Sequence, residues 1–126
     1  MIWLHVVAVL VVAQYMGFGI LVGWARGRYK VQAPAVTGDP MFERLYRVHM
    51  NSLEQMVALL PAMYLSAQFW SPLWSAAAGV AYIVGRLVYL KAYASAPQSR
   101  TLGFVMSFFP IVGLLAATLM GALMAG

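Results

Sequence analysis

One segment of the sequence carries ionisable and amide side chains at helical spacing. The segment FERLYRVHMNSLEQM contains, at intervals of four, four and three residues, Glu43, Arg47, Asn51 and Glu54. In an α-helix these intervals place side chains on one face over about three turns. Such a face offers a cation, an amide and two carboxylates. Together these groups suit a small zwitterionic peptide with carboxylates, an ammonium group and amides of its own.

A second polar stripe follows later in the chain. Its members, separated by four, three and four residues, are Tyr82, Arg86, Tyr89 and Tyr93. Three phenols and one guanidinium therefore share a helix face. A carboxylate such as Glu54 would cost at least about 2.5 kcal/mol if it lay unpaired at membrane depth. We therefore expect Arg86, of the same or a neighbouring subunit, to be its ion partner.

These groups also have a purely structural interpretation. Intramembrane Arg and Glu can hold helices together, and tyrosines can form an interfacial belt, which is the favoured interpretation for Tyr82. Ionisable residues at membrane depth are usually functional, so a binding site is preferred for the others. His5 and His49 lack a ligand motif and predict no metal site. The absence of cysteine excludes a cysteine nucleophile and a thiolate metal site.

Four apolar segments must position these side chains. Each is long enough to cross a bilayer at about 1.5 Å per residue, and they span residues 2–24, 41–70, 73–93 and 102–124. Polar or proline-containing stretches separate them and end the helices. The sequence therefore predicts an all-α fold, a single domain over residues 1–126 that forms an integral membrane four-helix bundle.

The composition supports a lipid environment. The chain is 63% hydrophobic and 9% charged, whereas soluble domains use about 25% charged residues. The net charge of +5 comes from basic residues in loops and at helix ends, so nucleic acid is not an expected partner. The first and third loops are basic and the second carries no charge. Both basic loops should face the cytoplasm, with both termini on the other side.

Three stretches carry a resemblance to a known family. The segment FERLYRVHMNSLE resembles the second-helix motif E-R-x-x-R-A-x-x-N-x-x-E of the MAPEG family, the membrane-associated proteins in eicosanoid and glutathione metabolism. The segments VTGDPMFER and RLVYLKAYASAPQSR resemble its microsomal glutathione transferases and leukotriene synthase. The similarity covers about residues 25 to 100.

The resemblance implies a homotrimer with three glutathione sites at subunit interfaces, open toward the cytoplasm. One subunit would hold the tripeptide with Arg47, Asn51 and Glu54. Its neighbour would contribute Arg86, Tyr89 and Tyr93 across the interface. Arg26 and Arg44 would be weaker candidates for binding the carboxylates of glutathione.

The family chemistry is attack by a glutathione thiolate on an electrophile. A nearby cation favours the thiolate over the thiol, and by position this cation would be Arg100, with Tyr93 or Tyr89 hydrogen-bonding to the sulfur. Hydrophobic electrophiles or lipid hydroperoxides would enter from the membrane lipid. The implied function is a detoxifying glutathione transferase or glutathione-dependent peroxidase, located in the inner membrane if the chain is bacterial.

Departures from the family pattern limit this interpretation. Gly27 and Gln55 stand where the leukotriene-synthase branch has an arginine and a tyrosine, and Val48 replaces the motif alanine. These differences argue against leukotriene synthesis. A non-catalytic lipid-binding scaffold of the same family is the alternative, although a scaffold needs no thiol-activating cation. A small multidrug transporter is disfavoured because the first helix lacks an acidic residue.

Overall fold

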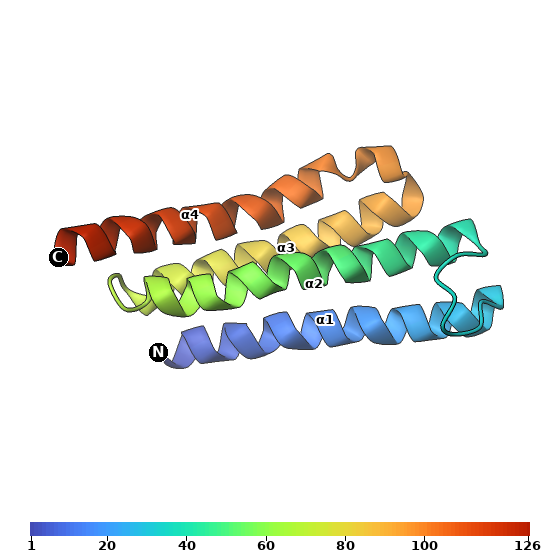
Figure 1. The fold of residues 1–126 in the computed structure, drawn as a ribbon, viewed down its shortest axis with the longest axis horizontal. Coiled ribbons are helices and arrows are strands. Elements are labelled where there is room, and N and C mark those ends of the chain that lie inside the picture. Colours follow the sequence, from blue (N-terminus) through green and yellow to red (C-terminus); the bar gives the residue numbers. More distant parts are fainter.

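The computed structural model describes the whole chain, residues 1–126, except the side chain of Pro97. Four long helices lie side by side along the molecule (Figure 1), and the described chain contains no β-strand. The helices are α1 (Ile2–Tyr29), α2 (Pro40–Ser66), α3 (Pro72–Ser95) and α4 (Thr101–Ala125), with a short 3-10 helix, η1 (Pro97–Ser99). The predicted all-α four-helix bundle is confirmed.

Two helix ends, those of α1 and α2, differ from the predicted bounds by more than two residues. The first helix continues beyond residue 24, and Arg26 and Arg28 lie in its last turn, where cations stabilise the free carbonyls. It ends at Tyr29, and the capping residue Lys30 adopts a left-handed conformation with φ 58°. The second helix ends at Ser66 rather than residue 70. The chain turns there toward α3, and the N–H of Trp70 donates to the Ser66 carbonyl at 2.9 Å.

The start of α2 is defined by its local sequence. Asp39 caps the helix by accepting a hydrogen bond from the N–H of Phe42 at 3.0 Å, and Pro40 occupies the first helical position. Before the cap, Gly38 has a φ of 135°, which favours glycine, and its N–H donates to Oε2 of Glu43 at 3.1 Å. These contacts determine where the polar face of α2 begins.

The inner helices are α2 and α3, each of which contacts the other three long helices. Two glycines allow α3 and α4 to approach closely. A Cβ on Gly85 would lie 2.7 Å from the backbone nitrogen of Ser107, and a Cβ on Gly103 would overlap the backbone of Tyr89. The N-terminal end of α4 is thereby held against the part of α3 that carries Tyr89.

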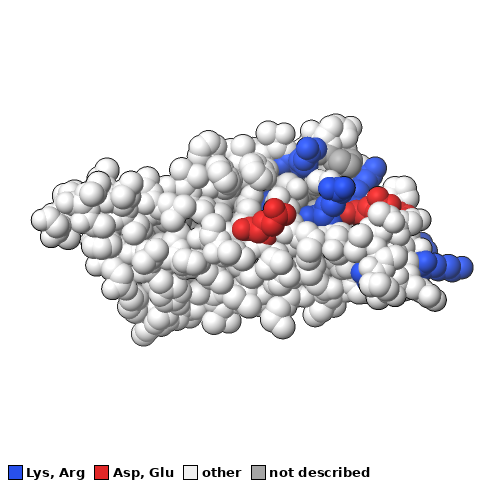
Figure 2. Space-filling view, viewed as in Figure 1, with Lys and Arg blue, Asp and Glu red and all other residues white. Residues whose placement is uncertain are grey.

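The bundle has the character of a membrane domain. Helices α1, α3 and α4 are long and apolar enough to cross a bilayer. Helix α2 is more polar in its first half but runs beside them at similar length (Figure 1). Figure 2 shows the charged side chains gathered toward one end of the molecule, while both chain termini lie at the other end. The structure is therefore an integral membrane bundle with one charged end.

Candidate functional site

A polar cleft of about 420 Å³ opens at the charged end of the bundle. It is formed by the loop between α1 and α2, by α2 and α3, and by the N-terminal end of α4. The lining residues are Val36, Thr37, Glu43, Tyr46, Arg47, Met50, Asn51, Glu54, Tyr89, Tyr93 and Arg100. Segments far apart in the sequence therefore meet at a single cleft.

Helix α2 supplies the charged side of the cleft. The four residues predicted to share a face, Glu43, Arg47, Asn51 and Glu54, all line it. Arg47 and Glu54 are exposed to it, while Glu43 also accepts the hydrogen bond from the loop before the helix. This arrangement leaves a guanidinium, an amide and a carboxylate directed toward the same space.

Helix α3 and the start of α4 supply the opposite side. Tyr89 is buried and Tyr93 is half-buried, with their ring centroids 5.5 Å apart. Arg100 precedes the first residue of α4, and its guanidinium carbon lies 5.7 Å from the centroid of the Tyr93 ring, within the range of a cation–π contact. A cation and two phenols therefore line one side of the cleft. All three line the same cleft as Arg47 of this chain, and a contribution of the tyrosines to a neighbouring subunit's site stays a prediction.

Arg86 does not line the cleft. Its side chain has 0% exposure and lies behind Asn51, with Nη1 donating to Asn51 Oδ1 at 2.7 Å and to Ser52 Oγ at 3.3 Å. Within the described chain these contacts take the place of an ion pair with Glu54, and a pair with Glu54 of a neighbouring subunit stays a prediction. The guanidinium also packs on the Tyr89 ring, at 4.2 Å from its centroid.

Arg44 and Arg26, the weaker candidates for binding the carboxylates of glutathione, form hydrogen bonds to backbone carbonyls. Nη1 of Arg44 donates to the carbonyl of Ala94 at 3.0 Å and so ties α2 to the end of α3. Nη1 of Arg26 donates to the Ala35 carbonyl at 2.7 Å, and its guanidinium carbon lies 4.9 Å from the centroid of the Phe42 ring. Within this chain both arginines stabilise the walls around the cleft and do not line it.

Four residues of the cleft were not singled out from the sequence. Tyr46 and Met50 lie three and seven residues after Glu43, so they flank the predicted face and a wider helical sector would have included them. Val36 and Thr37 come from the loop before α2. Loop residues follow no helical period, and only the family resemblance of the segment VTGDPMFER points to them.

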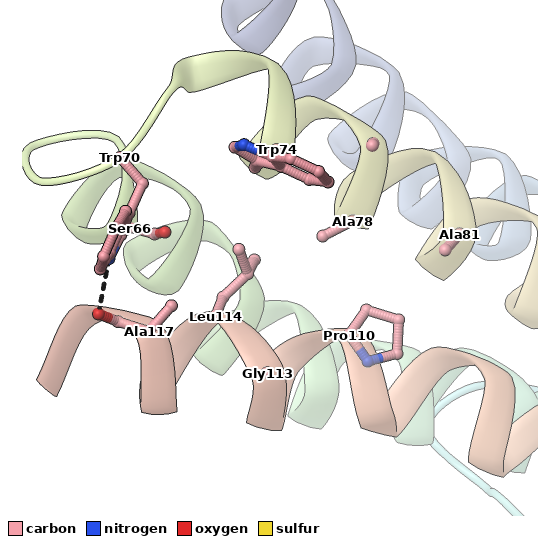
Figure 3. Close-up of a pocket in the computed structure, with 10 residues that line it drawn as sticks. Ser66, Trp70, Trp74, Ala78, Ala81, Pro110, Gly113, Leu114 and Ala117 are labelled. Carbon is pink, nitrogen blue, oxygen red and sulfur yellow. Dashed lines mark hydrogen bonds between the residues drawn. The ribbon is translucent and has the colours of Figure 1, made fainter. Parts of the chain in front are cut away.

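A second cavity, of about 550 Å³, lies between the C-terminal end of α2, the first half of α3 and the middle of α4 (Figure 3). It is lined mainly by small and apolar residues of α3 and α4, together with Trp70 and Trp74. The Nε1–H of Trp70 donates to the Ala117 carbonyl at 2.8 Å. Ser66 supplies the one hydroxyl that lines this cavity, and no titratable residue lines it that could activate this hydroxyl as a nucleophile. The polar cleft is therefore the candidate site.

No set of three or more His, Asp or Glu side chains comes together to hold a metal ion within the described part of the chain. The cleft instead combines cations, an amide, a carboxylate and phenols. Cations and amides bind carboxylates, while a carboxylate binds an ammonium group. The cleft therefore suits a polar ligand that carries both signs of charge.

Comparison with known proteins identifies the family. The family model of MAPEG matches residues 4–120. The chain belongs to the MAPEG family. Human microsomal glutathione S-transferase 2 is 37% identical over 123 residues, which cover 97% of this chain and 81% of the human protein. An uncharacterised protein from Synechocystis sp. is 35% identical over 123 residues, which cover 94% of this chain and 90% of that protein.

A further MAPEG relative, leukotriene C4 synthase of Bos taurus, is 34% identical over 83 residues, or 66% of this chain and 55% of that enzyme. The resemblance drawn from the second-helix motif is confirmed. It extends over nearly the whole chain, beyond the region of residues 25 to 100 that first indicated it.

Proposed function

We propose that this MAPEG protein is a membrane-bound glutathione transferase. The observation that carries the proposal is the convergence of the second-helix motif with Tyr89, Tyr93 and Arg100 at one cleft of the chain. The cleft offers groups of both charges, and glutathione carries two carboxylates, an ammonium group and two amides. The near-full-length similarity to microsomal glutathione S-transferase 2 supports the same ligand.

Within the cleft, Arg47 is the proposed partner of a glutathione carboxylate, because a guanidinium can bind one with two parallel hydrogen bonds. Glu54 is placed to accept from the ammonium group, and Asn51 to bond a backbone amide. Arg26 and Arg44 would contribute to carboxylate binding only after exchanging their present carbonyl partners for the ligand.

The reactive sulfur is proposed to lie near Arg100 and Tyr93. The Arg100 cation lowers the pKa of the glutathione thiol, and a phenol of Tyr93 or Tyr89 donates a hydrogen bond to the thiolate. In conjugation the sulfur forms a bond to the electrophilic carbon as the leaving group departs with its electron pair. With a lipid hydroperoxide, the thiolate attacks the peroxide oxygen, and a second glutathione completes reduction to the alcohol, water and glutathione disulfide.

The membrane arrangement forms part of the same proposal. The charged end with the cleft faces the cytoplasm, as the basic loops favour, and hydrophobic electrophiles reach it from the lipid. Three chains assemble into a homotrimer, with the neighbouring subunit covering the open side of each cleft. Both points are expected from the MAPEG resemblance.

Conjugation by the purified full chain tests the proposal. In detergent or liposomes, the protein should conjugate glutathione to an aryl halide faster than the uncatalysed reaction, with saturation in glutathione. The matched variant Arg47→Ala should raise the KM for glutathione. Binding of fatty acid without any conjugation would contradict the transferase and favour a lipid-binding scaffold.

A further inference from the structure

The bundle contains a buried guanidinium whose partners are few and directional. Arg86 has 0% exposure, and Nη1 provides its hydrogen bonds to Asn51 and Ser52 within the described chain. Its Nε and Nη2 have no hydrogen-bond partner there. In surroundings of low dielectric constant a charge-assisted hydrogen bond is strong, so the 2.7 Å contact to Asn51 is the main polar anchor of both side chains.

The surrounding bonds fix the position of this guanidinium. Ser52 Oγ donates to the Val48 carbonyl at 2.7 Å, which leaves its lone pairs to accept from Arg86. The hydroxyl of Tyr82 donates to the Ser52 carbonyl at 3.0 Å, and the Tyr89 ring packs on the guanidinium. In each of these hydrogen bonds one partner is a guanidinium, which can only donate, or a carbonyl, which can only accept, so the direction of the bond is determined.

The same bond determines which way the Asn51 amide faces. A guanidinium has donors and no acceptor, so only the amide oxygen of Asn51 can face Arg86. The NH2 group of Asn51 must then point away from that bond, and Asn51 itself lines the polar cleft. Without Arg86 the amide could turn by half a rotation and present its oxygen to the ligand instead.

From this geometry we infer that Arg86 is a positioning residue, which holds Asn51 so that its amide donates into the cleft and selects an acceptor group of the bound tripeptide. The inference rests on the proposed function, since it names glutathione as the ligand. Arg86 itself touches no ligand. Its effect passes through Asn51, with the Tyr89 ring as packing support.

A double-mutant cycle tests the inference on the full chain in detergent. Glutathione affinity is measured by calorimetry, and conjugation is measured with an aryl halide, for wild type, Arg86→Met, Asn51→Ala and the double variant; methionine is of similar length but has no N–H to donate to Asn51. Each single change should weaken glutathione binding about tenfold, as expected for one charge-assisted hydrogen bond. The double variant should bind no more weakly than Asn51→Ala alone, because the two residues act through one contact. The effect of Arg86→Met should fall on the KM for glutathione more than on kcat at saturating glutathione.

The outcomes separate the inference from the proposed function. Losses that add to about a hundredfold in the double variant would show that Arg86 acts independently of Asn51. Unchanged affinity in Arg86→Met would also overturn the inference, as would a matching fall in kcat, which indicates a general loss of packing. Absence of glutathione binding by the wild type would overturn the proposed function and the inference together.

A second variant keeps the test decisive if Arg86→Met does not fold. Asn51→Asp retains an acceptor oxygen for Arg86 but has no N–H to donate into the cleft. It should remain folded and lose glutathione affinity at least as strongly as Asn51→Ala. Wild-type affinity in Asn51→Asp would exclude a donor role for Asn51 and overturn the inference.

Discussion

Substitution of Gly103 by alanine should displace the catalytic end of α4. A Cβ at this position would lie 2.5 Å from the Cα of Tyr89, well inside ordinary van der Waals contact. The neighbour is backbone, which cannot rotate away, so α3 and α4 must separate by about 1 Å. Arg100 lies one turn before Gly103 and would move with the helix.

The expected effects follow from that separation. Overpacking of this kind typically costs about 1–3 kcal/mol, which should lower the thermal stability of the detergent-solubilised protein. A displacement of about 1 Å at a reacting group can reduce a rate by about a hundredfold. The conjugation rate should therefore fall by up to that factor, measured at saturating glutathione so that binding is not limiting.

A matched substitution provides the control. Gly113 lies in the same helix with nothing within 4 Å of an added Cβ. Gly113→Ala should leave the rate unchanged and stabilise the helix by up to about 1 kcal/mol. A Gly103→Ala protein with wild-type rate and stability would refute the argument that close helix approach positions Arg100.

Three further substitutions test other parts of the site and fold. Arg47→Ala should raise the KM for glutathione about tenfold with little change in kcat, because a carboxylate contact is lost; an unchanged KM would exclude that contact. Tyr93→Phe keeps the ring against Arg100 but removes the hydroxyl, so kcat should fall if this phenol donates to the sulfur; a wild-type kcat would assign that role to Tyr89. Asp39→Ala removes the N-cap of α2 and should destabilise the protein by about 1 kcal/mol in thermal unfolding, with no change expected if the cap is dispensable.

The positions of the helices and the polar face of α2 follow from local patterns. Apolar runs, prolines and loop polarity are local properties, and helical spacing alone places Arg47, Asn51 and Glu54 on one face. Helix ends are less predictable, because polar residues such as Arg26 and Arg28 can extend a helix beyond its apolar run.

Tertiary contacts were harder to predict from the sequence. Spacing places Arg86 on the same face as Tyr89 but does not determine how deeply each is buried. The structure buries Arg86 completely behind Asn51, and it directs Arg44 to a carbonyl of α3. Both outcomes depend on how α2 and α3 pack, which a single helix pattern does not contain.

The most direct test of the central claim is the thiolate absorption of bound glutathione in the ultraviolet. Glutathione added to the detergent-purified full chain should produce a thiolate band in the wild type. The band should persist in Arg28→Ala, which removes an exposed arginine outside the cleft. It should be lost in Arg100→Ala while binding remains. A full thiolate band in Arg100→Ala would contradict the proposed role of this cation, and no band in the wild type would contradict an activated thiolate.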